Sequence, residues 1–132
     1  KFIRTVLDDK QLVIFGDGEQ TRDFIYVSDI VQAIMLSISV KNNHSFNLFQ
    51  IASGIETSVN SFFEVLKNEL ESFKIKVKSP LYKPARDGEV FRSYSDISKA
   101  HSQLGFKPKT NLKLGINKTV RWFLDNYKVP EQ

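Results

Sequence analysis

Residues 16–33 read GDGEQTRDFIYVSDIVQA, and this stretch holds a turn, a strand and a helix start in direct succession. Its two glycines suit the positive φ angles of a tight turn. Residues 22–27 are rich in aromatic and β-branched side chains and predict a strand. Ser28 is predicted to cap the following helix, with Asp29 in the first turn, where a negative charge is favourable.

The helix that starts there is apolar on more than one side. Large aliphatic side chains recur at helical spacing from Val27 to Ile38. Further apolar residues, Ala33, Met35 and Leu36, fall on its other sides. A helix of this composition is expected to be buried on two sides. The other predicted elements are too few to cover it, so we expect a further layer supplied by a longer chain.

On either side of this stretch, short strands alternate with helices. Strands are predicted at residues 12–15, 46–51 and 74–78, and helices at 2–7, 58–70, 96–104 and 112–127. Residues 79–95, which hold two of the four prolines, predict an extended loop. The pattern predicts an α/β fold of a few short strands and about four helices. The 132 residues fit one domain, 1–132.

The composition excludes several classes of protein. Hydrophobic residues make up 41% and charged residues 26%, which is ordinary for a folded globular chain. No apolar run approaches the roughly 18 residues of a membrane helix, so no membrane partner is expected. The chain has no cysteine, which excludes disulfides, thiolate metal sites and cysteine nucleophiles. Together with the lack of a signal peptide, this favours a cytoplasmic location.

The charge is unevenly distributed along the chain. Residues 1–66 carry a net −3 and residues 67–132 a net +7, within a total of +4. The basic half could face a nucleotide diphosphate, a nucleic acid or an acidic surface. Its lysines stand singly among other residues, as on a solvated surface, and no nucleic-acid-binding motif accompanies them. We therefore expect no nucleic-acid partner.

Residues that could carry out catalysis are scarce. His44 and His101 have no catalytic or metal-ligating partners at useful spacing, so no catalytic or metal-binding residue is predicted. The Gly16-x-Gly18 pair lacks the third glycine of a dinucleotide fingerprint and leads into a predicted strand rather than a helix. No cofactor-binding residue is therefore predicted either.

Two arginines are the stronger candidates for function. Arg22 opens the strand after the glycine turn, and Arg86 lies in the proline-containing loop. An arginine fork can hold a phosphate by two hydrogen bonds, and two forks can clamp a diphosphate. The alternative is a surface ion pair, worth under about 1 kcal/mol.

Several segments, taken together, resemble the NAD-dependent epimerase/dehydratase family, the extended short-chain dehydrogenases that act on nucleotide sugars. The segment 16–33 is similar to a hallmark of that family. Further similar segments follow in the family's order: Phe49–Gly54, Thr57–Val59, Arg86–Val90, Asp96–Ala100, Leu104–Pro108 and Leu112–Phe123. The segment at 49–54 departs from the family pattern at Gln50 and Ala52. The resemblance covers nearly the whole chain.

The resemblance implies the C-terminal, substrate-binding part of such an enzyme. The family's preceding Rossmann domain binds NAD and carries a catalytic Tyr-x-x-x-Lys pair. Here Tyr26, Tyr82, Tyr94 and Tyr127 are followed four residues on by Ile, Arg, Ser and Glu. The chain also starts at Lys1, and its one Met is internal. We therefore expect a fragment that is inactive alone, with NAD bound by a missing N-terminal half.

The resemblance also implies roles for particular residues. Arg22 and Arg86 would bind the diphosphate of a nucleotide sugar, most simply a UDP-sugar. Glu89, which stands where the family has Asp, would bind the ribose. The strand Val13–Phe15, including both of those side chains, would lie near the base. The implied protein partners are the chain's own N-terminal Rossmann domain and, in the full-length protein, a second copy in a homodimer.

The family's reaction begins with oxidation of the sugar at C4, with Tyr as base and NAD as hydride acceptor. An epimerase then reduces the 4-keto sugar on its other face, whereas a dehydratase first removes water across C5–C6. The Arg86–Val90 loop and the Asp96–Lys99 segment favour a UDP-hexose or UDP-N-acetylhexosamine 4-epimerase. The alternatives are a nucleotide-sugar 4,6-dehydratase, or a stand-alone module that binds anions or a protein without catalysis.

Overall fold

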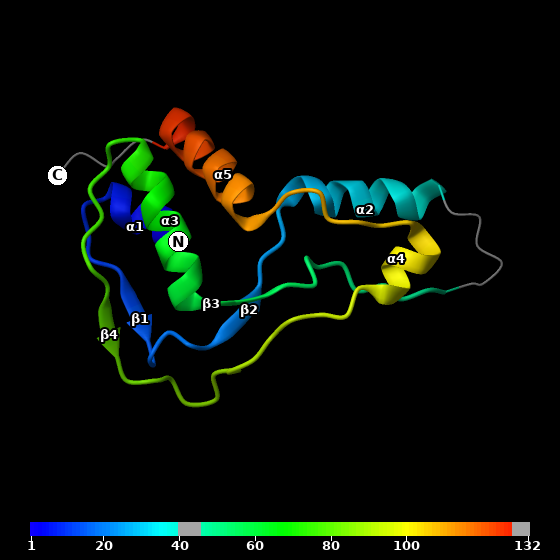
Figure 1. Cartoon of the computed structure of the whole chain (residues 1–132), viewed down its shortest axis with the longest axis horizontal. Coiled ribbons are helices and arrows are strands. Elements are labelled where there is room, and N and C mark those ends of the chain that lie inside the picture. Colours follow the sequence, from blue (N-terminus) through cyan, green and yellow to red (C-terminus); the bar gives the residue numbers. More distant parts are fainter. Residues whose placement is uncertain (40–45, 128–132) are drawn as a thin grey trace.

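The computed structural model describes residues 1–39 and 46–127. Over those residues the helices are α1 (Phe2–Leu7), α2 (Val27–Ser39), α3 (Val59–Ser72), α4 (Ser98–Leu104) and α5 (Leu112–Asn126). The strands are β1 (Val13–Phe15), β2 (Thr21–Asp23), β3 (Glu56–Ser58) and β4 (Leu81–Lys83). Helices α1, α3 and α5 gather with β1 and β4 at one end, and α2 lies beside α4 at the other (Figure 1). The predicted α/β class is confirmed.

The strands form two separate two-stranded sheets. Strand β1 pairs in parallel with β4, with Val13 opposite Leu81. Strand β2 pairs antiparallel with β3, with Arg22 opposite Thr57. The β2–β3 pair lies between the two groups of helices (Figure 1).

The larger core lies where α1, α3 and α5 pack over β1. Thr57 and Ser58 are the two residues that could cap α3, and Ser58 does so, because its hydroxyl accepts a hydrogen bond from the Ser61 N–H at 3.1 Å. The apolar residues of α3 recur every three or four positions and so face this core. The buried members are Ile3, Val6, Leu12, Ile14, Phe63, Leu66, Leu70, Ile116 and Val120.

A second, smaller core lies between α2 and α4. Its buried members are Ala33, Ala100, Leu104 and Phe106. Gly105 ends α4 with φ 68°, a left-handed conformation that suits glycine. The turn returns the chain over the helix, where the Phe106 N–H bonds the Ala100 carbonyl at 3.2 Å. Phe106 thereby becomes fully buried.

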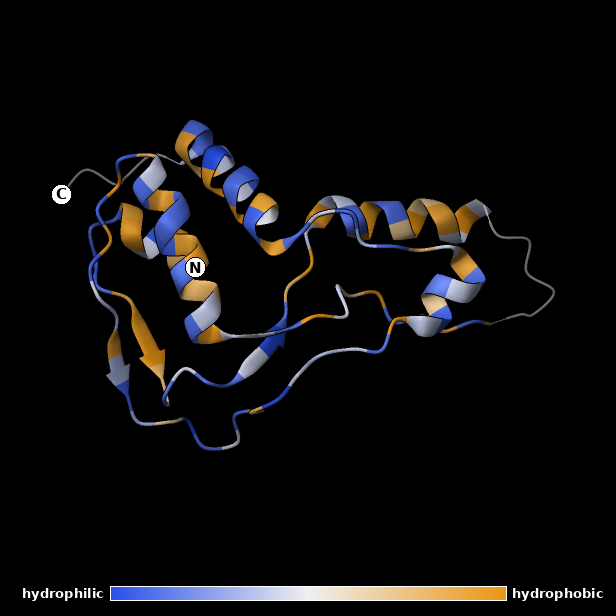
Figure 2. Cartoon of the chain, in the orientation of Figure 1, coloured by the Kyte–Doolittle hydropathy of each residue, from blue (hydrophilic) through white to orange (hydrophobic). Residues whose placement is uncertain are grey.

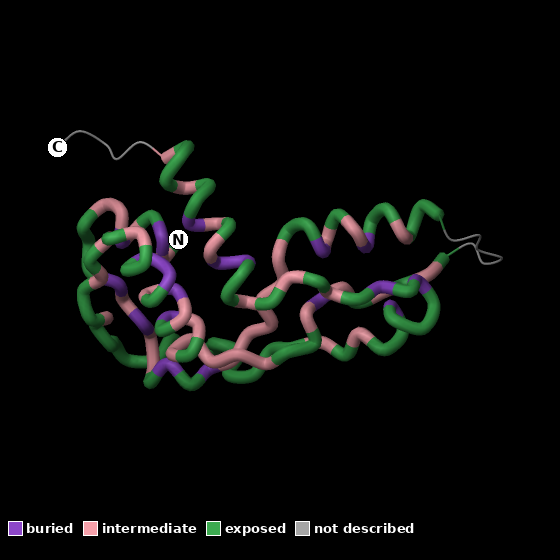
Figure 3. The backbone as a smooth tube through the Cα atoms, turned by 45° about the horizontal axis from the view of Figure 1, so that its top comes forward, coloured by how far each residue is buried: buried purple, intermediate pink, exposed green. Residues whose placement is uncertain are grey.

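Helix α2 is covered on one side only. It begins at Val27, so Ser28 lies inside the helix and the predicted cap at Ser28 is wrong. Its buried residues are Asp29 and Ala33. Large apolar side chains on its outer side are exposed, in contrast to the burial on two sides predicted from its composition (Figures 2 and 3). They are Val27, Val31, Ile34, Met35 and Ile38, exposed by 53–73%, and we call them the α2 apolar face.

Three strand predictions need correction. Residues 46–51 form no strand, because Phe49 and Ile51 pack against the smaller core instead of pairing with a neighbour. Residues 74–78 keep the predicted alternation, with exposed lysines and with Ile75 and Val77 against the larger core, but they join no ladder. The strand predicted at 22–27 is limited to Thr21–Asp23.

Strands also occur where none is predicted. Strand β3 ends at Ser58, the cap of α3, and β4 lies inside the predicted loop 79–95. Within the described residues, no helix is long and apolar enough to cross a membrane.

Candidate functional site

One end of β1 opens into a cavity of about 430 Å³. Val13 and Phe15 from β1 line it, together with Arg86 and Glu89 from the loop that follows β4. The parallel pairing of β1 with β4 explains this meeting, because it delivers the loop after Lys83 beside the end of β1. A second cavity of about 240 Å³ shares Phe15, Arg86 and Glu89 with the first.

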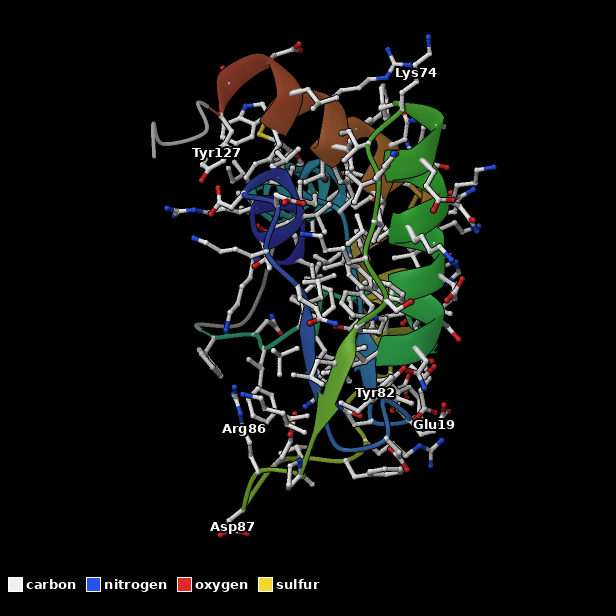
Figure 4. All side chains as sticks on the ribbon, turned by 90° about the vertical axis from the view of Figure 1, so that its left-hand side faces the viewer. Glu19, Lys74, Tyr82, Arg86, Asp87 and Tyr127 are labelled. Carbon is white, nitrogen blue, oxygen red and sulfur yellow. The ribbon has the colours of Figure 1, made fainter. Side chains whose placement is uncertain are left out.

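Arg86 packs on an aromatic ring. Its guanidinium carbon lies 3.7 Å from the centre of the Phe15 ring, a cation–π contact that holds the cation at the cavity. Arg86 and Tyr82 lie on opposite sides of β4, and Asp87 lies at the tip of the loop (Figure 4). The Glu89 N–H bonds the Arg86 carbonyl at 3.2 Å across a turn in which Gly88 has φ 75°. A glycine at this position permits the turn.

Arg22 joins this group through Glu89. Its Nη2 lies 3.4 Å from Glu89 Oε1, and its Nη1 donates to the Thr21 carbonyl at 2.7 Å. The two charged side chains are 32% and 27% exposed, so both are partly shielded from water. Arg22 itself does not line either cavity within the described residues.

The structure therefore gathers the five residues singled out in the sequence. Val13, Phe15, Arg86 and Glu89 line one cavity, and Arg22 reaches it through its ion pair. Their roles toward a ligand remain predictions.

Other residues at the site carried no signal in the sequence. Gln20 is 7% exposed, donates from Nε2 to the Phe15 carbonyl at 2.7 Å and lines both cavities. Lys1 and Lys83 line the larger cavity and add positive charge to it. A buried glutamine in a polar turn looks like any solvated residue until the fold is known, and the lysines resemble the rest of the basic surface.

Asp23, next to Arg22 in β2, holds a neighbouring turn in place, which the sequence did not predict. Its Oδ1 accepts from the Ser53 N–H at 2.7 Å and from the Ser53 hydroxyl at 2.6 Å. Its Oδ2 accepts from the Gly54 N–H at 2.9 Å. These bonds fix the 53–54 turn beside β2, so Asp23 acts on the scaffold of the site.

The histidines stand apart from this group. His101 is exposed on α4, and His44 lies outside the described residues. In the described part of the chain, no cluster of three or more His, Cys, Asp or Glu could hold a metal ion.

Comparison with known proteins decides the family. The sequence profile of the family described as GDP-mannose 4,6 dehydratase matches residues 1–119. The chain belongs to this family. Its members include the nucleotide-sugar epimerases and dehydratases of the extended short-chain dehydrogenase type, and the chain is similar to the C-terminal part of such enzymes. The predicted resemblance is confirmed.

Two proteins similar to this member of the GDP-mannose 4,6 dehydratase family are named as epimerases. A Methanocaldococcus jannaschii protein, provisionally named a UDP-glucose 4-epimerase, is 42% identical over 125 residues, which is 95% of this chain and 38% of that protein. The UDP-glucose 4-epimerase of Thermotoga maritima, solved with UDP-glucose, is 37% identical with a TM-score of 0.84. The match covers 96% of this chain and 39% of the Thermotoga chain.

A third relative was solved with a cofactor. The UDP-glucuronic acid 4-epimerase of Bacillus cereus, in complex with UDP-glucuronic acid and NAD, is 28% identical with a TM-score of 0.80. The match covers 95% of this chain and 38% of the Bacillus chain. The chain thus spans about two fifths of the length of these relatives.

The glycine turn of this family member does not fit the phosphate-binding turn of an NAD site. The turn with Gly16 and Gly18 connects β1 to β2, so no helix N-terminus follows it. A dinucleotide-binding turn needs that helix N-terminus for the pyrophosphate.

Proposed function

We propose that this chain supplies the nucleotide-sugar binding part of an NAD-dependent nucleotide-sugar 4-epimerase. The observation that carries the proposal is the cavity beside β1, which combines an apolar wall with Arg86 and Glu89, while Arg22 is joined to it by its ion pair with Glu89. A nucleoside diphosphate needs this combination: a surface for the base, an acceptor for the ribose and cations for the phosphates.

The charges at the cavity support binding of a diphosphate. Of the two arginines, only Arg22 forms an ion pair within the described residues. Its contact with Glu89 is long, at 3.4 Å, so a phosphate oxygen can compete for the guanidinium. Release of the Glu89 carboxylate would then leave it able to accept hydrogen bonds from ribose hydroxyls. Arg86 keeps its donors while its face rests on Phe15.

The edge of β1 supports the placement of the base. The Leu12 carbonyl accepts from the Leu81 N–H and the Gly16 N–H donates to the Lys83 carbonyl, each at 2.8 Å. Backbone groups alternate in direction along a strand, so the N–H and C=O of Val13 face the opposite edge of β1. They are available there to pair with the donor and acceptor edge of a base such as uracil.

The named relatives favour the epimerase over the dehydratase. Those with solved structures are UDP-sugar 4-epimerases. NAD, held by another part of the enzyme, would supply the oxidation and reduction at C4. The share of this chain in that reaction is to bind and orient the UDP-sugar, and we expect the chain alone to be inactive.

The α2 apolar face supports a partner domain. Its five large side chains would be costly to leave in water, and the relatives are more than twice as long as this chain. We infer that an N-terminal NAD-binding domain covers this face, and that the whole enzyme is a homodimer.

The two arginines provide the test of this function. Isothermal titration of UDP into the full-length gene product should show affinity that falls on the order of 10- to 100-fold in Arg22→Ala and Arg86→Ala. The control is Arg121→Ala, an exposed arginine on α5 that should leave affinity within about twofold. Equal affinities in all three variants would disprove the diphosphate clamp.

An activity assay distinguishes a 4-epimerase from a 4,6-dehydratase. Full-length protein with NAD should interconvert UDP-glucose and UDP-galactose, or the corresponding UDP-N-acetylhexosamines. Accumulation of a 4-keto-6-deoxy sugar would identify a dehydratase and correct the proposal.

A further inference from the structure

The loop that carries Arg86 and Glu89 is anchored at both ends by backbone hydrogen bonds. At its start, the Lys83 carbonyl accepts from the Gly16 N–H at 2.8 Å. At its end, Thr21 bonds the loop twice, from its N–H to the Phe91 carbonyl at 2.8 Å and from its carbonyl to the N–H of residue 93 at 3.2 Å. The position of the site residues therefore depends on how firmly these ends are held.

A carboxylate from a third segment reinforces the second anchor. Glu56 of β3 accepts from Arg92 Nε at 2.7 Å with Oε1 and from Arg92 Nη2 at 2.8 Å with Oε2. The same Oε1 accepts from the Thr21 hydroxyl at 2.6 Å. The hydrogen bonds from Arg92, and then that from Thr21, lower the pKa of Glu56 to about 2. One ionised side chain thus joins β2, β3 and the loop.

These contacts connect the two halves of the binding site. Thr21 precedes Arg22 in β2, and Arg92 lies three residues after Glu89. Side chains alternate along a strand, so Thr21 and Arg22 point to opposite faces of β2. Glu56 contacts Thr21 and therefore lies on the face of β2 opposite Arg22. From there it can affect the position of Arg22 through Thr21, but it cannot contact a ligand bound by Arg22.

We propose that Glu56 is a positioning residue for the diphosphate site, holding Arg22 and the Arg86–Glu89 turn at a fixed separation through its bonds to Thr21 and Arg92. This rests on the proposed nucleotide-sugar function. Two cations from different segments clamp a diphosphate well only if their separation is set before binding, because ordering them on binding costs affinity.

The geometry separates this interaction from an ordinary surface ion pair. An exposed ion pair loses side-chain entropy when its two long side chains are held in place, so it contributes little to stability. The Arg92 side chain is 63% exposed, but that of Glu56 is only 25% exposed. Glu56 also accepts two hydrogen bonds from the Arg92 guanidinium and a third from the Thr21 hydroxyl, which an ordinary surface pair lacks. Arg92 is further restrained because its guanidinium lies 4.8 Å from the centre of the Tyr94 ring.

The test compares two ligands that differ only in the diphosphate. UDP and uridine are titrated by calorimetry into the full-length wild type, Glu56→Gln and Arg92→Lys, with Glu64→Gln as the control at an exposed glutamate of α3. We expect UDP affinity to fall at least about tenfold in the first two variants, while uridine changes less than about twofold. Arg92→Lys keeps the charge and removes the fork, so it tests positioning even if Glu56→Gln folds poorly.

The possible results distinguish the two proposals. UDP affinity unchanged in both variants, or UDP and uridine weakened equally, would overturn the positioning role. A wild type that binds no UDP would instead overturn the nucleotide-sugar function, and the positioning role with it.

Discussion

At the scale of single residues, Asn60 connects the turn before Arg22 with the strand before Arg86. Its Nδ2 donates to the Asp17 carbonyl at 2.9 Å and to Glu19 Oε1 at 2.6 Å. Its Oδ1 accepts from the Tyr82 hydroxyl at 2.9 Å, and Tyr82 and Glu19 lie on the α3 side of β4 (Figure 4). One amide near the start of α3 therefore secures both segments that lead to the site.

Gly18 lies so close to Asn60 that it cannot gain a side chain. A Cβ there would collide with the Asn60 amide, and Gly18 has φ 80°. We expect Gly18→Ala to destabilise the protein by about 1–2 kcal/mol through its left-handed conformation. Each hydrogen bond that Asn60 loses on moving should add about 1 kcal/mol. Urea denaturation measures the sum.

Gly105→Ala is the matched control for this prediction. Gly105 also has positive φ, 68°, but a Cβ there would meet nothing within 4 Å. Gly105→Ala should therefore lose only the stability that a left-handed alanine costs, with no added clash. Equal losses in the two variants would show that the contact with Asn60 does not matter.

At the scale of elements, a buried carboxylate ties α2 to the segment before α5. Asp29 is 2% exposed and accepts from the backbone N–H groups of Lys109 at 3.1 Å and Thr110 at 3.0 Å. Those two residues precede Asn111, which caps α5 through the Leu114 N–H. The orientation of the two helices thus depends on Asp29.

Removal of this tie should destabilise the whole fold. Asp29→Ala leaves the partly buried N–H groups of Lys109 and Thr110 without their acceptor, so we expect a loss on the order of 3 kcal/mol in urea denaturation. Asp29→Asn keeps one acceptor oxygen and should lose less. Asp125→Ala, at an exposed aspartate of α5, serves as the control. If Asp29→Ala were as stable as this control, the hydrogen bonds of Asp29 would contribute nothing to the stability of the fold.

At the scale of the whole molecule, the α2 apolar face separates an enzyme part from a stand-alone module. If another domain covers it, Ile34→Lys in the full-length gene product should cost about 2 kcal/mol of stability, because a buried isoleucine is lost. Ser39→Lys, at an exposed serine of the same helix, should stay within about 0.5 kcal/mol. Thermal and urea denaturation measure both variants. An Ile34→Lys protein as stable as wild type would favour a module whose α2 is exposed in use.

Local patterns predicted the helices well. The cap at Ser58, the apolar spacing of α3 and the Gly105 turn each depend on residues within a few positions, so the chain near them carries the information. The cap predicted at Ser28 would start α2 at Asp29, two residues after its actual start at Val27, which is within the usual uncertainty of a helix boundary. Arg22 and Arg86 were predicted from their chemistry, and Val13, Phe15 and Glu89 from the resemblance to the family; the structure brings all five together, and their roles stay predictions.

The strands and the supports of the site depended on distant residues. Paired residues of β1 and β4 are 68 positions apart, for example Val13 and Leu81. Residues 46–51 have a strand-like pattern but pair with no strand in the described part of the chain. Glu56 and Arg92, 36 positions apart, look like two solvated charges until β2, β3 and the loop meet.

By itself, the sequence predicted the helices from local spacing, and its motifs identified the family by resemblance. The same resemblance implied a diphosphate site at Arg22 and Arg86, which stays a prediction. Only the tertiary structure decided which strands pair, that Arg22 meets Glu89, and that Gln20, Asp23 and Glu56 form hydrogen bonds between separate segments of the chain. Those outcomes depend on long-range contacts whose free energy appears only when separate segments are brought together.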